Sequence, residues 1–244
     1  GLIMFLLFRR RSFFTVLAFC ILLVVGGFFM ILHQQPAAPT LSWVMGEKTF
    51  LIDPGHGGTF PGRVNDSVLE KSINLEIALK LDALLEETGA QVVMPRRADT
   101  DLIPQEAKEE KLLLQQRADL AQRIAMGQQS KADYFISIHC NSIPDEKWSG
   151  AQVFYNPEDP QSEKLAQAIQ QMLIAQLGDH DREALPREDT YLFRNATMPT
   201  VIIECGFLSN KEEAANLQDS AYQQQLAWAI YLGLNNYLAQ ENPQ

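Results

Sequence analysis

The chain has 244 residues, of which 46% are hydrophobic and 20% are charged, and its net charge is −10. The first 40 residues hold three arginines and no acid, so the remainder carries 17 basic and 30 acidic residues. This acidic balance argues against binding nucleic acid through its phosphates, and against a domain that lies on anionic lipid. The length suffices for one globular domain with a sizeable core.

An apolar segment follows a short basic start. Residues 1–12 include Arg9, Arg10 and Arg11, and residues 13–32 contain no charged side chain. Twenty such residues can cross a bilayer, and the arginines predict a cytoplasmic start and an exported body. Signal peptides have a shorter apolar core, and no good cleavage site follows, so an uncleaved anchor is favoured over a cleaved signal. Residues 33–47 then form a polar link to a domain over 48–244.

The domain begins with a strand that ends in a histidine-bearing loop. Residues 50–58 read FLIDPGHGG, in which the first three residues are an apolar run typical of a buried strand. Pro54 and Gly55 end the strand, because proline lacks a donor for the sheet and glycine permits a turn. His56 therefore lies at the carboxyl end of a strand, which is where open α/β sheets bind ligands.

A helix is predicted to follow over residues 69–88. Its apolar residues recur at helical spacing, and Gly89 ends it. Glu70 lies in the first turn, where an acid complements the helix dipole, and it is also a candidate ligand beside His56. Spacing alone does not choose Glu70 over Asp66 for that role, and Glu76 is expected to be solvated.

A second strand ends in a second histidine. Residues 133–141 read DYFISIHCN, so His139 closes the apolar run that starts at Tyr134. Two imidazoles at one sheet edge are typical of a zinc site, and a catalytic zinc site takes one further protein ligand. The alternative is two unrelated histidines with local hydrogen bonds. The remaining histidines, His33 and His180, are expected to be exposed.

Other segments are assigned in chain order. Strands are predicted over 91–94 and 150–155, and helices over 112–124, from Ser162, and over 210–237. The charged run 106–111 is expected to be a solvated face, although it could line a substrate groove. Residues 178–189 are predicted to be a charged loop, and Tyr191–Phe193 to start a strand pair. Strands alternating with helices predict an α/β sandwich with a mainly parallel sheet.

An acid and a cysteine end the last predicted strand. Residues 201–206 read VIIECG, and Glu204 would be costly to bury without a partner or a metal. A carboxylate beside a metal site can take a proton from water. Because side chains alternate along a strand, Cys140 and Cys205 should point away from a site that includes His139 and Glu204. Buried thiols are expected, with a disulfide between them as the alternative.

Four sequence blocks in this order resemble the zinc-dependent N-acetylmuramoyl-L-alanine amidases. They are DPGHGG, EKSINL, SIHCN and ECGFLSN, and the resemblance covers about residues 48–239. It implies a three-layer sandwich with a central mixed sheet flanked by helices. It further implies zinc ligands at His56, Glu70 and His139 and a catalytic carboxylate at Glu204. Arg96 and Asp99 match a pair that the family often has, expected here as a structural loop pair.

The resemblance also implies a substrate and a setting. The expected reaction is hydrolysis of the amide between the lactyl group of N-acetylmuramic acid and L-alanine of the peptidoglycan stem peptide. The domain organisation of the chain is most similar to that of the germination-specific amidases of spore cortex. This similarity implies muramic lactam formation, action outside the membrane and a monomeric catalytic domain. Expected partners are an accessory protein or a downstream muramic acid deacetylase, and no nucleic acid.

The sequence is consistent with three alternatives. The chain could be another extracytoplasmic zinc hydrolase, such as a carboxypeptidase that cuts within the stem peptide. It could be a non-catalytic wall-binding regulator on the same fold, although both histidines and both glutamates are present. A hydrolase with Cys205 as nucleophile would need a histidine base on the opposite face of the strand.

Overall fold

The computed structural model describes residues 43–65, 68–178 and 181–241. The predicted membrane anchor, His33, Asp66 and His180 lie outside these residues. Within the described ranges, no helix has both the length and the apolar character needed to cross a bilayer.

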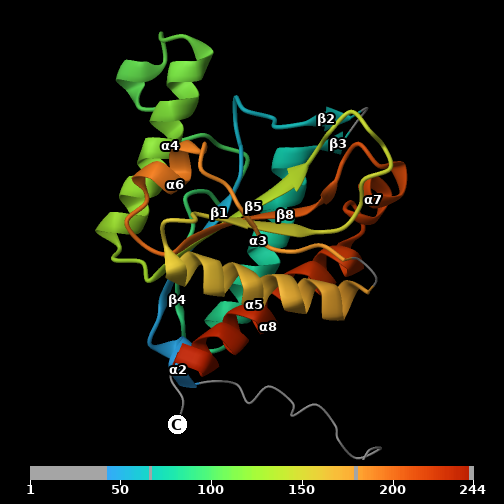
Figure 1. The fold of residues 1–244 in the computed structure, drawn as a ribbon. Helices are drawn as coiled ribbons and strands as arrows, with labels where there is room; N and C mark the ends of the chain where they lie inside the picture. The colour runs from blue at the N-terminus through green and yellow to red at the C-terminus, as the bar shows by residue number, and fades with distance from the viewer. Residues whose placement is uncertain (1–42, 66–67, 179–180, 242–244) are drawn as a thin grey trace, which may run out of the picture. The chain divides into compact units, whose positions relative to one another are not determined.

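A six-stranded mixed sheet forms the centre of the domain, in the order β4-β1-β5-β8-β6-β7 (Figure 1). The first four strands in that order run parallel, β6 runs antiparallel to β8, and β7 runs parallel to β6. The predicted mixed, mainly parallel sheet is therefore confirmed. The strands are β1 (Thr49–Pro54), β4 (Gln91–Val93), β5 (Tyr134–Asn141), β6 (Gln152–Tyr155), β7 (Leu185–Pro186) and β8 (Thr200–Phe207).

Helices cover both faces of the sheet and complete three layers. One face packs against α3 (Glu70–Glu86), α5 (Pro160–Leu177) and α8 (Ser220–Glu241), and α5 and α8 run side by side in Figure 1. The other face packs against α4 (Leu112–Gln129) and α6 (Tyr191–Asn195). The smaller elements are α2 (Trp43–Gly46), η1 (Gln105–Ala107), α7 (Lys211–Asn216) and the hairpin of β2 (Val64–Asn65) and β3 (Val68–Leu69).

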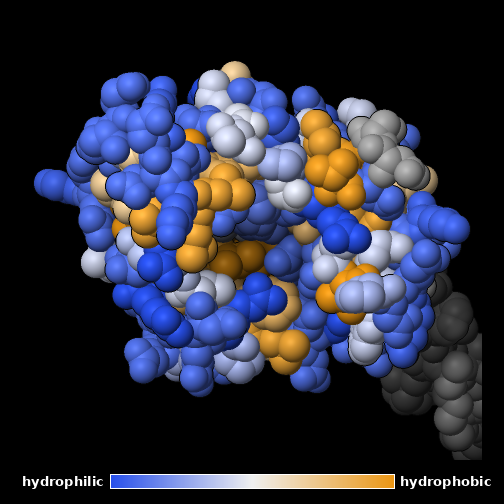
Figure 2. Space-filling model, turned by 90° about the horizontal axis from the view of Figure 1, so that it is seen from above, coloured by the Kyte–Doolittle hydropathy of each residue, from blue (hydrophilic) through white to orange (hydrophobic). Residues whose placement is uncertain are grey.

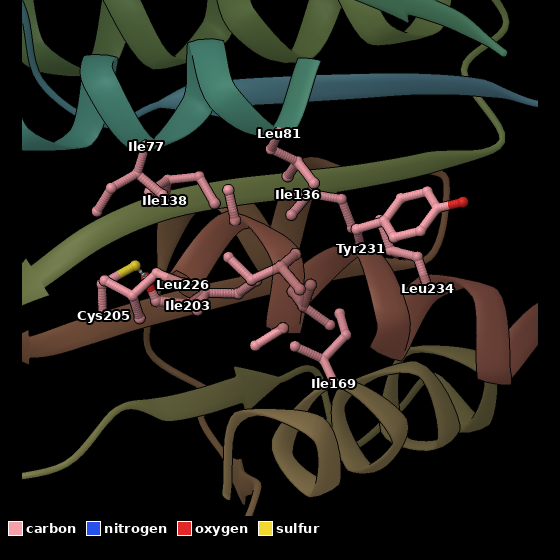
Figure 3. Close-up of a cluster of buried hydrophobic side chains, with 14 of the residues drawn as sticks. Ile77, Leu81, Ile136, Ile138, Ile169, Ile203, Cys205, Leu226, Tyr231 and Leu234 are labelled. Carbon is pink, nitrogen blue, oxygen red and sulfur yellow. Dashed lines mark hydrogen bonds between the residues drawn. The ribbon is translucent and has the colours of Figure 1, made fainter. Parts of the chain in front are cut away.

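Side-chain alternation along the strands produces two apolar cores. Ile136 and Ile138 of β5 face α3 and α8, where Ile77 and Leu81 of α3 point toward them (Figure 3). Phe135, which is paired with Thr200 of β8, packs into the second core under α4 and α6. Residues 135, 137 and 139 thus share one face of β5, and this fixes the face to which His139 belongs.

Two local predictions were wrong. Tyr191–Phe193 starts the short helix α6 rather than a strand, because Thr190 caps it by accepting a hydrogen bond from the backbone amide of Phe193. Part of the predicted charged loop 178–189 forms β7, whose two residues add an edge strand to β6. Strands this short leave too little pattern for sequence analysis to detect.

Gly233 lets α8 approach α5 closely. A Cβ atom built on Gly233 would lie 2.5 Å from the Cα atom of Ile169 in α5, and both residues are buried. Backbone atoms at this distance cannot be moved by turning a side chain. The contact between α5 and α8, which covers one face of the sheet, therefore depends on the absence of a side chain at this position.

We predict that Gly233→Ala lowers the free energy of unfolding by about 1–3 kcal/mol, because the added methyl group overpacks the helix contact. This loss should appear although alanine favours a helix over glycine by about 1 kcal/mol. Chemical denaturation followed by circular dichroism measures it. Gln224→Ala, at an exposed position of the same helix, is the control and should not destabilise. A Gly233→Ala protein as stable as wild type would contradict the close contact.

Candidate metal centre

Three of the predicted site residues converge at the carboxyl ends of two neighbouring strands. His56 follows β1, His139 lies in β5, and Glu70 is the first residue of α3. One ligand-type atom from each lies within 4.8 Å of the others. The structure thus brings together side chains that are 14 and 69 residues apart in the sequence, and Glu76, further along α3, is exposed as expected.

The spacing of these atoms suits one tetrahedral metal ion. Oε1 of Glu70 lies 3.2 Å from Nε2 of His56 and 3.1 Å from Nδ1 of His139. Two atoms that bind the same zinc ion at about 2.0–2.2 Å lie about 3.3 Å from each other. The two imidazole rings meet nearly edge to face, with centroids 4.9 Å apart. Two imidazoles and a carboxylate are also a donor set that zinc commonly takes.

The Glu70 carboxylate is fixed from several sides. Oε2 accepts a hydrogen bond of 2.8 Å from the backbone amide of Arg63, and Oε1 accepts one of 3.2 Å from that of Cys140. Asn74, one turn along α3, donates to Oε1 at 3.3 Å. Burial raises the pKa of Glu70, but the contacts with His139 and His56 outweigh it and hold the pKa well below its usual range. The carboxylate is therefore charged, as a metal ligand must be.

Two buried arginines hold the loop that carries His56. Arg123 of α4 donates to the carbonyl oxygen of His56 at 2.8 Å and to that of Pro54 at 3.0 Å. Arg96 donates to the carbonyl oxygens of Pro54 and Gly55 at 2.9 and 3.0 Å. These bonds satisfy carbonyl groups that the end of β1 leaves without a strand partner. They fix His56 in a left-handed conformation, with φ of 64°.

In the described part of the chain, no hydrogen bond joins Arg96 to Asp99, so the expected pair does not form. Asp99 instead pairs with Lys71 at 2.7 Å and accepts from the backbone amide of Gly58 at 2.8 Å. Both residues therefore brace the histidine loop, each through partners of its own.

The absence of a side chain at Gly55 leaves room for the imidazole ring of His139. A Cβ atom on Gly55 would lie 2.3 Å from Nε2 and Cε1 of His139, too close for any side chain. The backbone amide of Gly55 donates to the carbonyl oxygen of Ile138 at 2.9 Å, which joins the two strand ends. The first glycine of the loop is thus required by the close approach of the second histidine.

Glu204 lies beside the three converging residues. It is paired in register with His139 on the adjacent strand β8, and it is 9% exposed. Its Oε2 is buried and has no hydrogen-bond partner among the described residues, while Oε1 lies 3.9 Å from Nη1 of Arg187. Burial raises the pKa of Glu204. A buried carboxylate with an unused oxygen and a raised pKa is suited to accept a proton.

A cavity of about 230 Å³ opens next to these residues. Figure 2 looks onto the side of the molecule where α4 begins and shows a hollow near its middle. His56 and His139 line the cavity together with Phe60 and with Leu120 of α4. A ligand in this cavity would reach both imidazoles.

The thiol groups of the two cysteines of the domain take no part in the site. Cys140 and Cys205 are free thiols buried in the core beneath α3 and α8, on the sheet face opposite His139. The expected alternation is confirmed, and the alternative of a disulfide is not. Burial raises the pKa of both thiols, which disfavours the thiolate that a nucleophilic cysteine requires.

Sequence reasoning missed the groups that support the site. Arg123 and Asp119 are four residues apart on α4, a spacing that indicates an ion pair but not that the arginine also binds Asp53. Arg187 lies in a segment that sequence analysis assigned to a charged loop, and no pattern there indicates its approach to Glu204.

Comparisons with known proteins agree with this geometry. Residues 50–236 match the family model described as N-acetylmuramoyl-L-alanine amidase. The chain is 41% identical over 194 residues to the germination-specific N-acetylmuramoyl-L-alanine amidase of Bacillus subtilis, covering 80% of this chain and 81% of that protein. It is 32% identical over 217 residues to the amidase LytC of the same organism, covering 86% of this chain and 40% of LytC.

A solved structure is similar in fold as well. The CwlD amidase of Clostridioides difficile, solved in complex with the GerS lipoprotein, superposes with a TM-score of 0.76 and is 40% identical. The match covers 79% of this chain and 99% of that one. Because the family model spans most of the domain and these relatives match about four-fifths of the chain, the protein belongs to the N-acetylmuramoyl-L-alanine amidase family.

Proposed function

We propose that His56, Glu70 and His139 hold a zinc ion and that Glu204 moves the protons of the amidase reaction. The observation that carries this proposal is the spacing of the three ligand atoms around the Glu70 carboxylate, with an unpartnered carboxylate oxygen of Glu204 on the adjoining strand. Bound zinc supplies Lewis-acid chemistry, in that it lowers the pKa of a water to about 7 and polarises a carbonyl group.

Glu204 acts first as a base and then as an acid. Its free Oε2 accepts a proton from the attacking water, and the same oxygen then delivers it to the nitrogen of the leaving amine. Burial raises its pKa, which makes the carboxylate a better proton acceptor than an exposed glutamate. Arg123 and Arg96 contribute by holding the loop that positions His56.

The bond that is cut joins the lactyl group of N-acetylmuramic acid to L-alanine of the stem peptide. This is the reaction of the family to which the chain belongs. The similarity to the germination-specific amidase of Bacillus subtilis supports a role in spore cortex, where removal of the peptide precedes muramic lactam formation. A muramic acid deacetylase would then act on the exposed product.

The setting that fits this substrate is outside the cytoplasmic membrane. The apolar run over residues 13–32 would anchor the domain there, with residues 33–47 as the link. The CwlD amidase, 40% identical, was solved in complex with a lipoprotein, which supports a lipoprotein as the accessory partner of this chain as well.

The reaction is tested by digesting purified peptidoglycan with the purified protein and weighing the released fragments by mass spectrometry. We predict free stem peptides with L-alanine at the amino end and sugar chains with an unsubstituted lactyl group. A chelator should abolish the release, and added zinc should restore it. Fragments shortened at the carboxyl end of the stem would instead identify a carboxypeptidase, and no release under any condition would favour a non-catalytic regulator.

A second prediction tests whether Glu70 is a metal ligand, by comparison with another glutamate of the same helix. Glu70→Gln should lose bound zinc, because the neutral amide is a weaker ligand and cannot balance the ion's charge. Glu76→Gln, six residues further along α3 and exposed, makes the same change without touching the site and should keep zinc. Metal analysis of both purified proteins decides it, and an equal zinc content in the two would reject Glu70 as a ligand.

A third prediction concerns the proton carrier. Glu204→Gln should retain zinc and the fold but lose turnover by a factor of about 10²–10⁴, the usual contribution of a positioned acid–base group. Release of stem peptide is measured at equal zinc occupancy, with Glu76→Gln as the control. If the variant kept most of its activity, another group would have to carry the proton.

A further inference from the structure

Arg187 occupies a defined place on the far side of Glu204. The strand order puts β8 between β5 and β6, so the metal ligands lie on one side of Glu204 and β6 and β7 lie on the other. Arg187 directly follows β7, and its backbone amide donates to the carbonyl oxygen of Tyr155 in β6 at 2.9 Å. Its position is therefore set by the sheet rather than by a free loop.

The guanidinium group of Arg187 is fixed in position, but within the described residues its hydrogen-bond donors remain free. It stacks over the ring of Phe154 in β6 at 3.8 Å from the ring centroid, and its side chain is 32% exposed. Stacking uses the face of the planar group and leaves the N–H donors at its rim available. Its only ion-pair partner in the described part of the chain is Glu204, at 3.9 Å, which is beyond hydrogen-bond distance.

The proposed reaction gives the substrate a direction across this site. Glu204 must reach the nitrogen of the leaving amine, so the released peptide begins beside Glu204. The metal ligands lie on the side of β1 and β5, where the adjoining cavity lined by Phe60 and Leu120 can take the lactyl part of the substrate, whose carbonyl group the metal would polarise. The peptide therefore continues from Glu204 toward β6 and β7, and Arg187 is the first side chain with free donors on that path.

We infer that Arg187 binds a carboxylate carried by the peptide part of the substrate, within its first two residues after the scissile bond. This inference rests on the proposed amidase reaction. An extended peptide advances by about 3.3–3.6 Å per residue. Because the guanidinium lies 3.9 Å from Glu204, a carboxylate on the first or second residue falls within its reach, and one at the end of a longer peptide does not. A planar guanidinium can bind a carboxylate through two parallel hydrogen bonds.

A second hollow lies on the same side of Glu204 as Arg187. Arg182 lies between the rings of Trp148 and Phe207, 5.0 Å from each centroid, and donates to the side chain of Gln152, which is paired in register with Glu204. These side chains, apart from Phe207, line a hollow of about 470 Å³ that Asp181 and Glu183 also border. The guanidinium group of Arg182 donates hydrogen bonds to Gln152 and to the carbonyl oxygen of Ser149, so its donors are partly used, in contrast to those of Arg187.

Two matched substrates test the inference. Both are muramoyl peptides with the same sequence, and they differ only in whether the carboxylate on the second residue is free or converted to its neutral amide. We predict that the wild-type protein prefers the acidic substrate by about 10- to 100-fold in kcat/KM, the range of a charge-assisted hydrogen bond, mainly through KM. Arg187→Gln should lose this preference, and Arg187→Lys should keep part of it.

The control is Lys211→Gln, which removes one positive charge from an exposed position at the start of α7 and should leave the preference unchanged. Zinc content and circular dichroism establish that each variant is folded. A preference for the acid that survives in Arg187→Gln would overturn the inference, and so would a wild-type protein with no preference.

A binding measurement makes the test independent of turnover and of variants. Calorimetry of the wild-type protein with the two released peptides, acidic and amidated, should show tighter binding of the acidic one by a similar factor. Equal affinities would overturn the inference. If neither substrate were cleaved at full zinc occupancy, the proposed reaction itself would fail, which is a different outcome from cleavage of both at equal rates.

Discussion

The site depends on a buried ion pair between Arg123 and Asp53. Their contact measures 2.6 Å, and each side chain is 1% exposed. A charge in such a place is costly without a partner, so Asp53 requires Arg123, and Arg123 in turn is balanced by Asp53 and Asp119. Burial raises the pKa of Asp53, but Arg123 outweighs it and keeps the carboxylate charged. The pair joins α4 to the end of β1, and its remaining donors hold the carbonyl oxygens of the loop that carries His56. The position of the first histidine is thus set by a helix more than sixty residues further along the chain.

The rest of the centre follows from ordinary sheet geometry. Parallel strands end at one edge, so His56 and His139 meet there, and side-chain alternation puts Glu204 on the same face as His139. Glu70 joins them because α3 begins at that edge. Burial affects these acids differently: the imidazoles keep Glu70 charged, while Glu204, with an unused oxygen, has a raised pKa. One carboxylate is suited to bind a metal ion and the other to accept a proton.

Much of this arrangement could be predicted from sequence, since it depends on short-range patterns. The apolar runs before His56, His139 and Glu204 predicted strands, the alternation predicted buried cysteines, and helical spacing predicted α3. The family resemblance then chose Glu70, which spacing could not distinguish from Asp66.

The supporting groups could not be predicted in the same way. Arg123 reaches Asp53 across 70 residues, and Arg187 reaches Glu204 only because a two-residue strand pairs with β6. Such contacts depend on how elements pack, which no local pattern records. The helix at Tyr191 was missed for a related reason: its cap at Thr190 outweighs the preference of its aromatic residues for a strand.

The central claim is that residues from two strand ends and one helix start hold a single metal ion. Diffraction from crystals of the zinc-loaded protein, recorded at the zinc absorption edge, tests it most directly. The account predicts one anomalous peak at about 2.0–2.2 Å from Nε2 of His56, Nδ1 of His139 and a carboxylate oxygen of Glu70. A peak elsewhere, or one that contacts fewer than these three side chains, would contradict it.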